Sequence, residues 1–184
     1  MAQSLHYFVS SLPLLRPGER PFLSHARLLQ DCRDQLDPSQ ADAIAGLALD
    51  PARCAGLALE TARRWRDFET LVRNTAARLR AARLGRPAPE PRPTALWDQH
   101  LTRLVEDAFA CPSPQERETR LDQARWQALD DLEAGHAFDL DAVAVYALKL
   151  LLLERIASRQ PDNAAFDALV EFGAQQAEEH RSEA

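Results

Sequence analysis

The stretch DAVAVYALKLLLLER, residues 141–155, constrains the fold of this chain more than any other. Its core is apolar on every side of a helix, and a membrane-spanning helix needs roughly 20 such residues in succession. Here the apolar run is interrupted by Lys149 and ends at Glu154, and charged side chains are costly inside a bilayer. We therefore predict no membrane insertion. The stretch is instead expected to form the central, fully surrounded helix of a bundle, with Leu151 at its centre.

The rest of the chain is also predicted to be helical. Ala, Leu and Arg are abundant, and only six of the 184 residues are glycine, a composition that favours helix. Several helix starts show an N-cap residue followed by proline, as in Asp37-Pro38, Asp50-Pro51 and Ser113-Pro114. The predicted fold class is therefore all-α, a helical bundle of about seven helices. These are expected at residues 22–36, 38–49, 51–84, 94–110, 113–134, 139–159 and 162–181.

Two aromatic segments give further local predictions. Leu5–Leu12 is expected to be an extended lead-in, because its residues Tyr7, Phe8 and Val9 favour extended structure. Trp97 begins an apolar stripe at helical spacing and is therefore predicted to lie in the core. The other members of this stripe are Leu101, Leu104, Val105 and Ala108.

A proline-rich segment divides the chain. Residues 86–93, RPAPEPRP, hold four prolines in eight positions, so they are predicted to form an extended, semi-rigid connector. The connector separates an N-terminal lobe, residues 1–85, from a C-terminal lobe, residues 94–184. Alternatively, it carries the chain from one end of a single bundle to the other, and the pattern does not decide between these.

Charge is distributed unevenly along the chain. From Arg63 to Arg92 there are nine arginines against three acidic residues, whereas residues 162–184 hold six acidic residues against one arginine. These two regions either complement each other or face separate partners.

No motif indicates catalysis or a cofactor. The chain contains no phosphate loop, dinucleotide fingerprint, nucleophile elbow or metalloprotease helix, so we predict neither an enzyme nor a cofactor-binding protein. Glu133 and His136 have the Glu-x-x-His spacing of di-iron bundles, but the second copy that such a site needs is missing. No metal site is therefore predicted, and a helical metalloenzyme is kept as the alternative of another class. The net charge of −6 argues against nucleic acid as a partner.

The richest stretch for recognition is WRDFETLVRNTAARLRAARLG, residues 65–85. Its buried stripe is formed by Trp65, Phe68, Val72 and Leu79. Arg66, Arg73 and Arg80 recur every seven residues on a different face. That face is either solvated and held by intrahelical pairs, such as Glu69 with Arg73, or it is a docking site for an acidic protein surface. Spacing alone favours the solvated face, because ion pairs of individual exposed arginines contribute little free energy.

Three stretches carry a resemblance to a known family: YFVSSLPLLRPGERPFLS from Tyr7 to Ser24, the element from Trp65 to Gly85, and the motif from Phe138 to Arg155. Together they resemble a bacterial family of unassigned function, whose members are typically encoded among the genes of V-type (A/V-type) ATPases. The middle element is also similar to a helix of the C-subunit of V-type ATPases, which is called the d-subunit in eukaryotic complexes.

The resemblance implies an interaction subunit without catalytic activity. The C-subunit is an all-helical socket on the cytoplasmic face of the rotor ring, where it receives the central stalk, although this chain is considerably shorter. The implied location is cytoplasmic, peripherally associated with the inner face of the membrane, and the implied partners are the rotor ring and the central stalk. The residues expected to bind a partner are Arg66, Arg73, Asn74 and Arg80. An assembly factor or adaptor for the same complex is the alternative.

Overall fold

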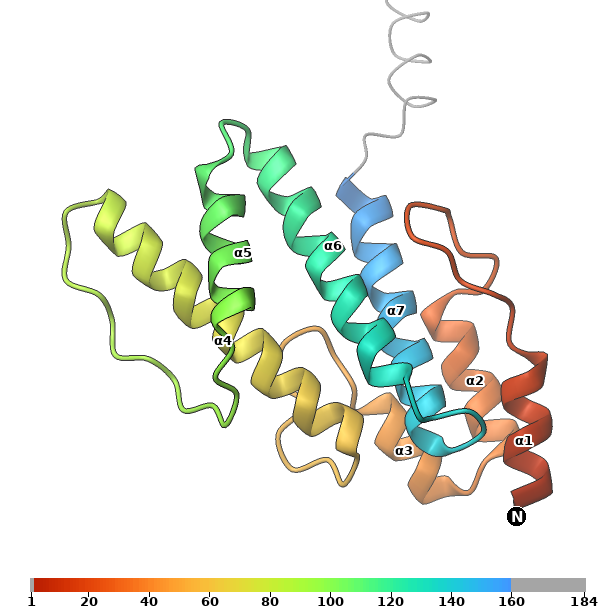
Figure 1. Ribbon diagram of the computed structural model, residues 1–184. Coiled ribbons are helices and arrows are strands. Elements are labelled where there is room, and N and C mark those ends of the chain that lie inside the picture. Colours follow the sequence, from red (N-terminus) through yellow and green to blue (C-terminus); the bar gives the residue numbers. More distant parts are fainter. Residues whose placement is uncertain (1, 160–184) are drawn as a thin grey trace, which may run out of the picture.

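The computed structural model describes residues 2–159, and within this range it contains seven α-helices and no strand (Figure 1). The all-α prediction is therefore confirmed. The helix expected over 162–181 lies outside the described residues. The helices are α1 (Ala2–Ser11), α2 (His25–Gln35), α3 (Pro38–Ala45), α4 (Glu60–Arg83), α5 (Gln99–Ala110), α6 (Pro114–Glu133) and α7 (Leu140–Arg159).

The prediction of an extended segment over Leu5–Leu12 is wrong, because most of it belongs to helix α1. Phe8 and Val9 follow Leu5 by three and four residues, so these side chains share one face of the helix. Phe8 is fully buried in the core, and Leu5, Val9 and Leu12, the residue just after the helix, pack against the same cluster. Burial of this helical face outweighs the preference of the individual residues for extended structure.

The long helix predicted over 51–84 begins only at Glu60. Residues 51–59 form turns and an irregular segment instead. The Asp50 side chain accepts a hydrogen bond from the amide two residues on, at 3.2 Å, which is a turn and not a helix cap. Gly56 then adopts a φ of 85°, a left-handed conformation that no right-handed helix can include.

Two of the predicted helix starts are confirmed. Asp37 precedes Pro38 at the start of α3, and Ser113 precedes Pro114 at the start of α6. The Ser113 hydroxyl accepts a hydrogen bond from the Glu116 amide at 3.4 Å. These caps depend only on neighbouring residues, which is why the sequence alone located them.

Helix α5 starts later than predicted, at Gln99 instead of residue 94. Its N-cap is Asp98, whose side chain accepts a hydrogen bond from the Leu101 amide at 3.0 Å. Trp97 therefore precedes the helix, and helical spacing does not apply to it. The prediction that Trp97 lies in the core is wrong, because 90% of its surface is exposed.

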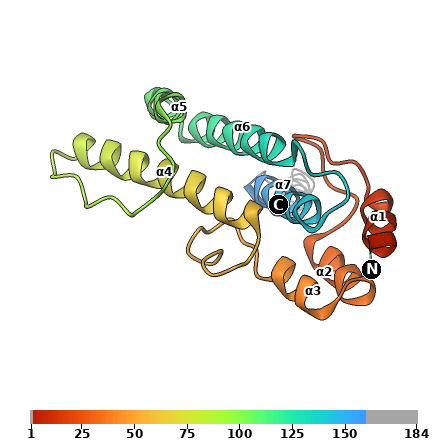
Figure 2. The same ribbon diagram turned by 60° about the horizontal axis from the view of Figure 1, so that its bottom comes forward.

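Helix α7 is the central helix, as predicted, and it contacts α1, α2, α3, α4 and α6 (Figures 1 and 2). Leu148, Leu150 and Leu152 are completely buried. Leu151, which we placed at the centre of the bundle, is only partly buried, although Ala147 and Leu148 on the preceding turn of the same face are fully buried. Among the described helices, none is long and apolar enough to cross a membrane.

The core consists of two clusters of buried side chains. The larger one surrounds α7, and the smaller one lies between α4, α5 and α6. Phe68 of α4 packs against both clusters. Helix α4 also contacts α5 and α6, which follow the connector. The division into lobes on either side of residues 86–93 stays a prediction.

Candidate interaction surface

The four residues predicted to bind a partner are distributed along α4, and each has a contact within the chain. An Nη atom of Arg66 lies 3.6 Å from the Asp67 carboxylate. The Arg80 guanidinium lies over the ring of Phe109, 5.4 Å from its centroid, a distance at which a cation is attracted to an aromatic face. Arg80 remains exposed and Arg66 partly exposed, so both retain surface for a partner.

Arg73 fastens the segment before α4 to the helix itself. Its Nη1 atom lies 3.0 Å from the Asp50 carboxylate, and its Nε atom lies 3.8 Å from Glu69. The predicted pair between Glu69 and Arg73 is thus present. The contact with Asp50 joins two residues that are 23 positions apart in the sequence. The spacing of residues within α4 does not predict this contact.

Asn74 holds the connector against α4. Its Nδ2 atom donates to the Arg92 carbonyl at 2.8 Å, and its Oδ1 atom accepts from the Arg92 amide at 3.0 Å. The side chain amide therefore pairs with both backbone groups of one residue, as a neighbouring strand would. This contact gives Asn74 a structural use that the sequence did not reveal.

Replacing Asn74 with alanine is expected to release Arg92 from α4. A hydrogen bond of this kind contributes about 1 kcal/mol, so exchange of the Arg92 amide hydrogen should become ~5-fold faster. Amide exchange followed by NMR measures this. Asn74→Asp is the matched control, because it keeps the acceptor for the Arg92 amide and loses only the donor. Equal exchange rates in the alanine variant and the unmodified chain would show that the contact does not hold the connector.

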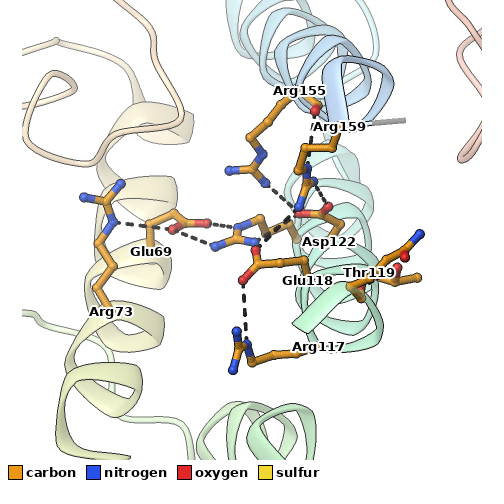
Figure 3. A network of polar contacts seen from close by, with 10 residues as sticks. Glu69, Arg73, Arg117, Glu118, Thr119, Asp122, Arg155 and Arg159 are labelled. Carbon is orange, nitrogen blue, oxygen red and sulfur yellow. Dashed lines mark hydrogen bonds and ion pairs between the residues drawn. The ribbon is translucent and has the colours of Figure 1, made fainter. Parts of the chain in front are cut away.

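A buried network of charged side chains joins α4, α6 and α7 (Figure 3). Glu69 of α4 is 1% exposed, and its carboxylate accepts two hydrogen bonds from the buried guanidinium of Arg125 in α6. Arg125 also pairs with Asp122 at 3.1 Å. From α7, Arg155 reaches Asp122 at 2.7 Å, and Arg159 pairs with the same carboxylate. The network therefore ties three helices together by charge.

The electrostatics of this network favour ion pairing between the three helices. Burial alone would lower the pKa of Arg125, but the Glu69 and Asp122 carboxylates outweigh it and raise that pKa above the ordinary value. The pKa of Arg155 is lowered, first by burial and then by the positive charge of Arg125. An arginine remains charged in either case. Each buried carboxylate is hydrogen-bonded to arginine, so neither is a free base for proton transfer.

The Glu133 and His136 side chains turn to different partners. Glu133 pairs with Lys149 of α7, and the His136 Nδ1 atom lies 2.7 Å from the Asp139 carboxylate. The hydrogen bond to Asp139 is the main cause that raises the pKa of His136. Within residues 2–159, no group of three or more His, Cys, Asp or Glu side chains is placed to hold a metal ion.

Trp97 is the most informative surface residue that sequence reasoning missed. The residues on either side of it are held in place. The Thr94 hydroxyl donates to the Asp67 carbonyl at 3.1 Å, Leu96 packs against the smaller core cluster, and Asp98 caps α5. The contact of Thr94 also places this segment beside the turn of α4 that carries Arg66. The indole of Trp97 is thus exposed to solvent on a backbone that is anchored on both sides, near the turn of α4 that carries Arg66.

Comparisons with protein-family models, with curated proteins and with solved structures found no match for this chain.

Proposed function

We propose that this chain is a non-catalytic interaction protein of a bacterial V-type ATPase, acting between the rotor ring and the central stalk on the cytoplasmic face of the membrane. The observation that supports an interaction function is the exposed side chain of Trp97, which projects from a backbone anchored beside α4. The resemblance of Tyr7–Ser24 and Trp65–Gly85 to the V-type ATPase-associated family supports the identity of the partner.

Exposure of the Trp97 side chain to water is energetically unfavourable. A tryptophan that is 90% exposed leaves a large apolar ring in water, and its burial by a partner recovers that free energy. Because both flanking segments are anchored, little backbone freedom is lost on binding. The partly exposed Arg66 on the adjacent turn of α4 adds a positive charge. The matching partner surface therefore offers an apolar pocket with an acidic rim.

The function is tested by affinity purification of the tagged chain from mildly solubilised native membranes. We expect rotor-ring and central-stalk subunits at fixed stoichiometry, in a complex that hydrolyses ATP. Recovery of incomplete complexes alone would favour the alternative function, an assembly factor or adaptor. Recovery of the chain without ATPase subunits would refute both. Elemental analysis of the same material decides against the helical metalloenzyme if no stoichiometric metal is present.

Trp97→Ala is expected to weaken capture of the partner without changing the fold. Truncating an anchor residue at an interface costs about 2 kcal/mol or more, which is ~30-fold in Kd. Capture yield in the same purification measures the loss, and thermal melting should be unchanged because the side chain is almost fully in solvent. The control is Phe22→Ala, which removes an equally exposed ring elsewhere. Unchanged capture with Trp97→Ala would remove this residue from the interface.

A further inference from the structure

Arg80 lies outside the surface around Trp97. It follows Arg66 on α4 by 14 positions, which is about 21 Å along the helix axis, whereas Trp97 lies near the turn that carries Arg66. Arg80 is instead close to the end of α4, and the end of α5 and the start of α6 lie toward this same end of the molecule (Figure 1). The two arginines therefore belong to different surfaces.

Three arginines converge on Phe109, in the last turn of α5. The guanidinium carbons of Arg80 and Arg117 lie 5.4 and 5.1 Å from the centroid of its ring. The Arg83 Nη2 atom donates to the Phe109 carbonyl at 3.0 Å. Phe109 is 6% exposed, so its ring is a fixed platform that attracts the two guanidinium groups. Arg80 and Arg83 are exposed, and Arg117 is partly exposed, so this cluster of positive charge reaches the surface.

The positive charge of this cluster is not balanced within the described part of the chain. There, neither Arg80 nor Arg83 forms an ion pair with an acidic side chain. These two arginines are three positions apart on α4, so their side chains are neighbours, and like charges on neighbouring helix positions repel. Among the described residues, Arg117 pairs only with Glu118, at 3.9 Å, and Glu118 also pairs with Arg159 at 3.5 Å. A bound anion would relieve this repulsion.

The negative groups near the cluster are engaged or point elsewhere. Glu116 pairs with Arg120 at 3.4 Å. Asp107 lies about 160° around α5 from Phe109, on another side of that helix. Backbone carbonyls in the last turn of α4 accept hydrogen bonds from amides of the following turn. Helix α6 begins one turn before Arg117, and the positive end of its dipole favours an anion nearby.

We propose that Arg80, Arg83 and Arg117 form a binding site for a phosphate group, with Arg80 and Arg83 donating hydrogen bonds to it. A phosphate group carries a charge of about −1.5 to −2 at pH 7 and offers three acceptor oxygens, which two guanidinium groups match in geometry. A single carboxylate supplies less charge to the three arginines. The site does not depend on the proposed ATPase partner, because Trp97 is not part of it. Trp97→Ala should therefore leave phosphate binding unchanged.

The test is a titration of the full-length chain with inorganic pyrophosphate at constant ionic strength, followed through the arginine Nε–Hε signals in NMR spectra. We expect the signals of Arg80 and Arg83 to shift and saturate in the millimolar range or below. Arg80→Gln removes a charge-assisted contact and should raise the Kd at least ~10-fold. The matched control is Arg78→Gln, which removes the same charge from the same stretch of α4, where Arg78 pairs with Glu106. It should change the Kd by roughly twofold or less, because charges at the surface are screened.

A second probe distinguishes the source of the phosphate group. Vesicles of phosphatidylcholine with phosphatidic acid present this group on a lipid surface, and co-sedimentation measures binding to them. Vesicle binding that Arg80→Gln abolishes and Arg78→Gln retains would identify a lipid headgroup as the ligand. Saturable binding of pyrophosphate without vesicle binding would identify a soluble phosphate compound. The absence of saturable binding to either probe, or an equal loss in both variants, would overturn the proposal, because the arginines would then only cover the ring of Phe109.

Discussion

Replacing Glu69 with alanine is expected to lower the free energy of unfolding by about 3–5 kcal/mol. The carboxylate is 1% exposed and is hydrogen-bonded to the buried guanidinium of Arg125. Without it, Arg125 loses its partner on α4 and keeps only Asp122, a carboxylate that it already shares with Arg155 and Arg159, and buried positive charge in excess of its partners is strongly unfavourable. Because domains of this size are stable by only about 5–15 kcal/mol, the loss should be obvious in urea unfolding followed by circular dichroism.

The unfolding free energies of two further variants distinguish the effect of the buried network from that of an exposed ion pair. Glu106→Ala breaks the exposed pair between Arg78 and Glu106, and it should cost less than about 1 kcal/mol. The double variant Glu69→Leu with Arg125→Met replaces both buried partners by apolar side chains, and it should recover most of the lost stability. If Glu69→Ala costs no more than Glu106→Ala, the network does not brace the three helices.

The network also positions the candidate interaction surface. Glu69 lies on α4 between the turns that carry Arg66 and Asn74, and Arg125 fixes it to α6. Asp122 then links α6 to α7 through Arg155. Helix α4 is therefore held near the central helix by charge as well as by apolar packing. The connector is fixed to the same scaffold, because Asn74 binds it to α4. A rigid scaffold of this kind is what an exposed anchor such as Trp97 requires.

The helices were predictable from the sequence because their signals are local. The caps at Asp37 and Ser113 depend on the next few residues, and the apolar run of α7 shows its central position through composition alone. Prediction from local propensity is wrong where tertiary packing determines the secondary structure. The aromatic residues of α1 favour extended structure individually, yet burial of Phe8 against the core selects a helix.

The candidate site was less predictable because its contacts join distant parts of the chain. Glu69 and Arg125 are 56 positions apart, and Asn74 and Arg92 are 18 apart, so no periodic pattern reveals these pairs. The exposure of Trp97 depends on where α5 begins. Thr94 and Asp98 are both N-cap candidates, and in the structure Asp98 caps α5 whereas the Thr94 hydroxyl contacts α4.

Leu148→Asp is expected to destabilise the chain by about 4 kcal/mol or more, enough to abolish cooperative unfolding. Leu148 is 0% exposed at the centre of α7, within the cluster that surrounds this helix. A carboxylate there is removed from water without a partner, and it also removes apolar packing. Thermal melting by circular dichroism, together with urea unfolding, measures the effect.

The same substitution at Leu151, one turn along the same helix, is the matched control for Leu148→Asp. Both variants change leucine to aspartate in the middle of α7, so the change in helix propensity is the same. Leu151 is only partly buried, and its carboxylate can remain in contact with water. We therefore expect Leu151→Asp to melt cooperatively at a temperature well above that of Leu148→Asp. Equal destabilisation by both substitutions would mean that position 151 is covered as completely as position 148, as the composition of α7 alone predicts, and would contradict the partial exposure of Leu151.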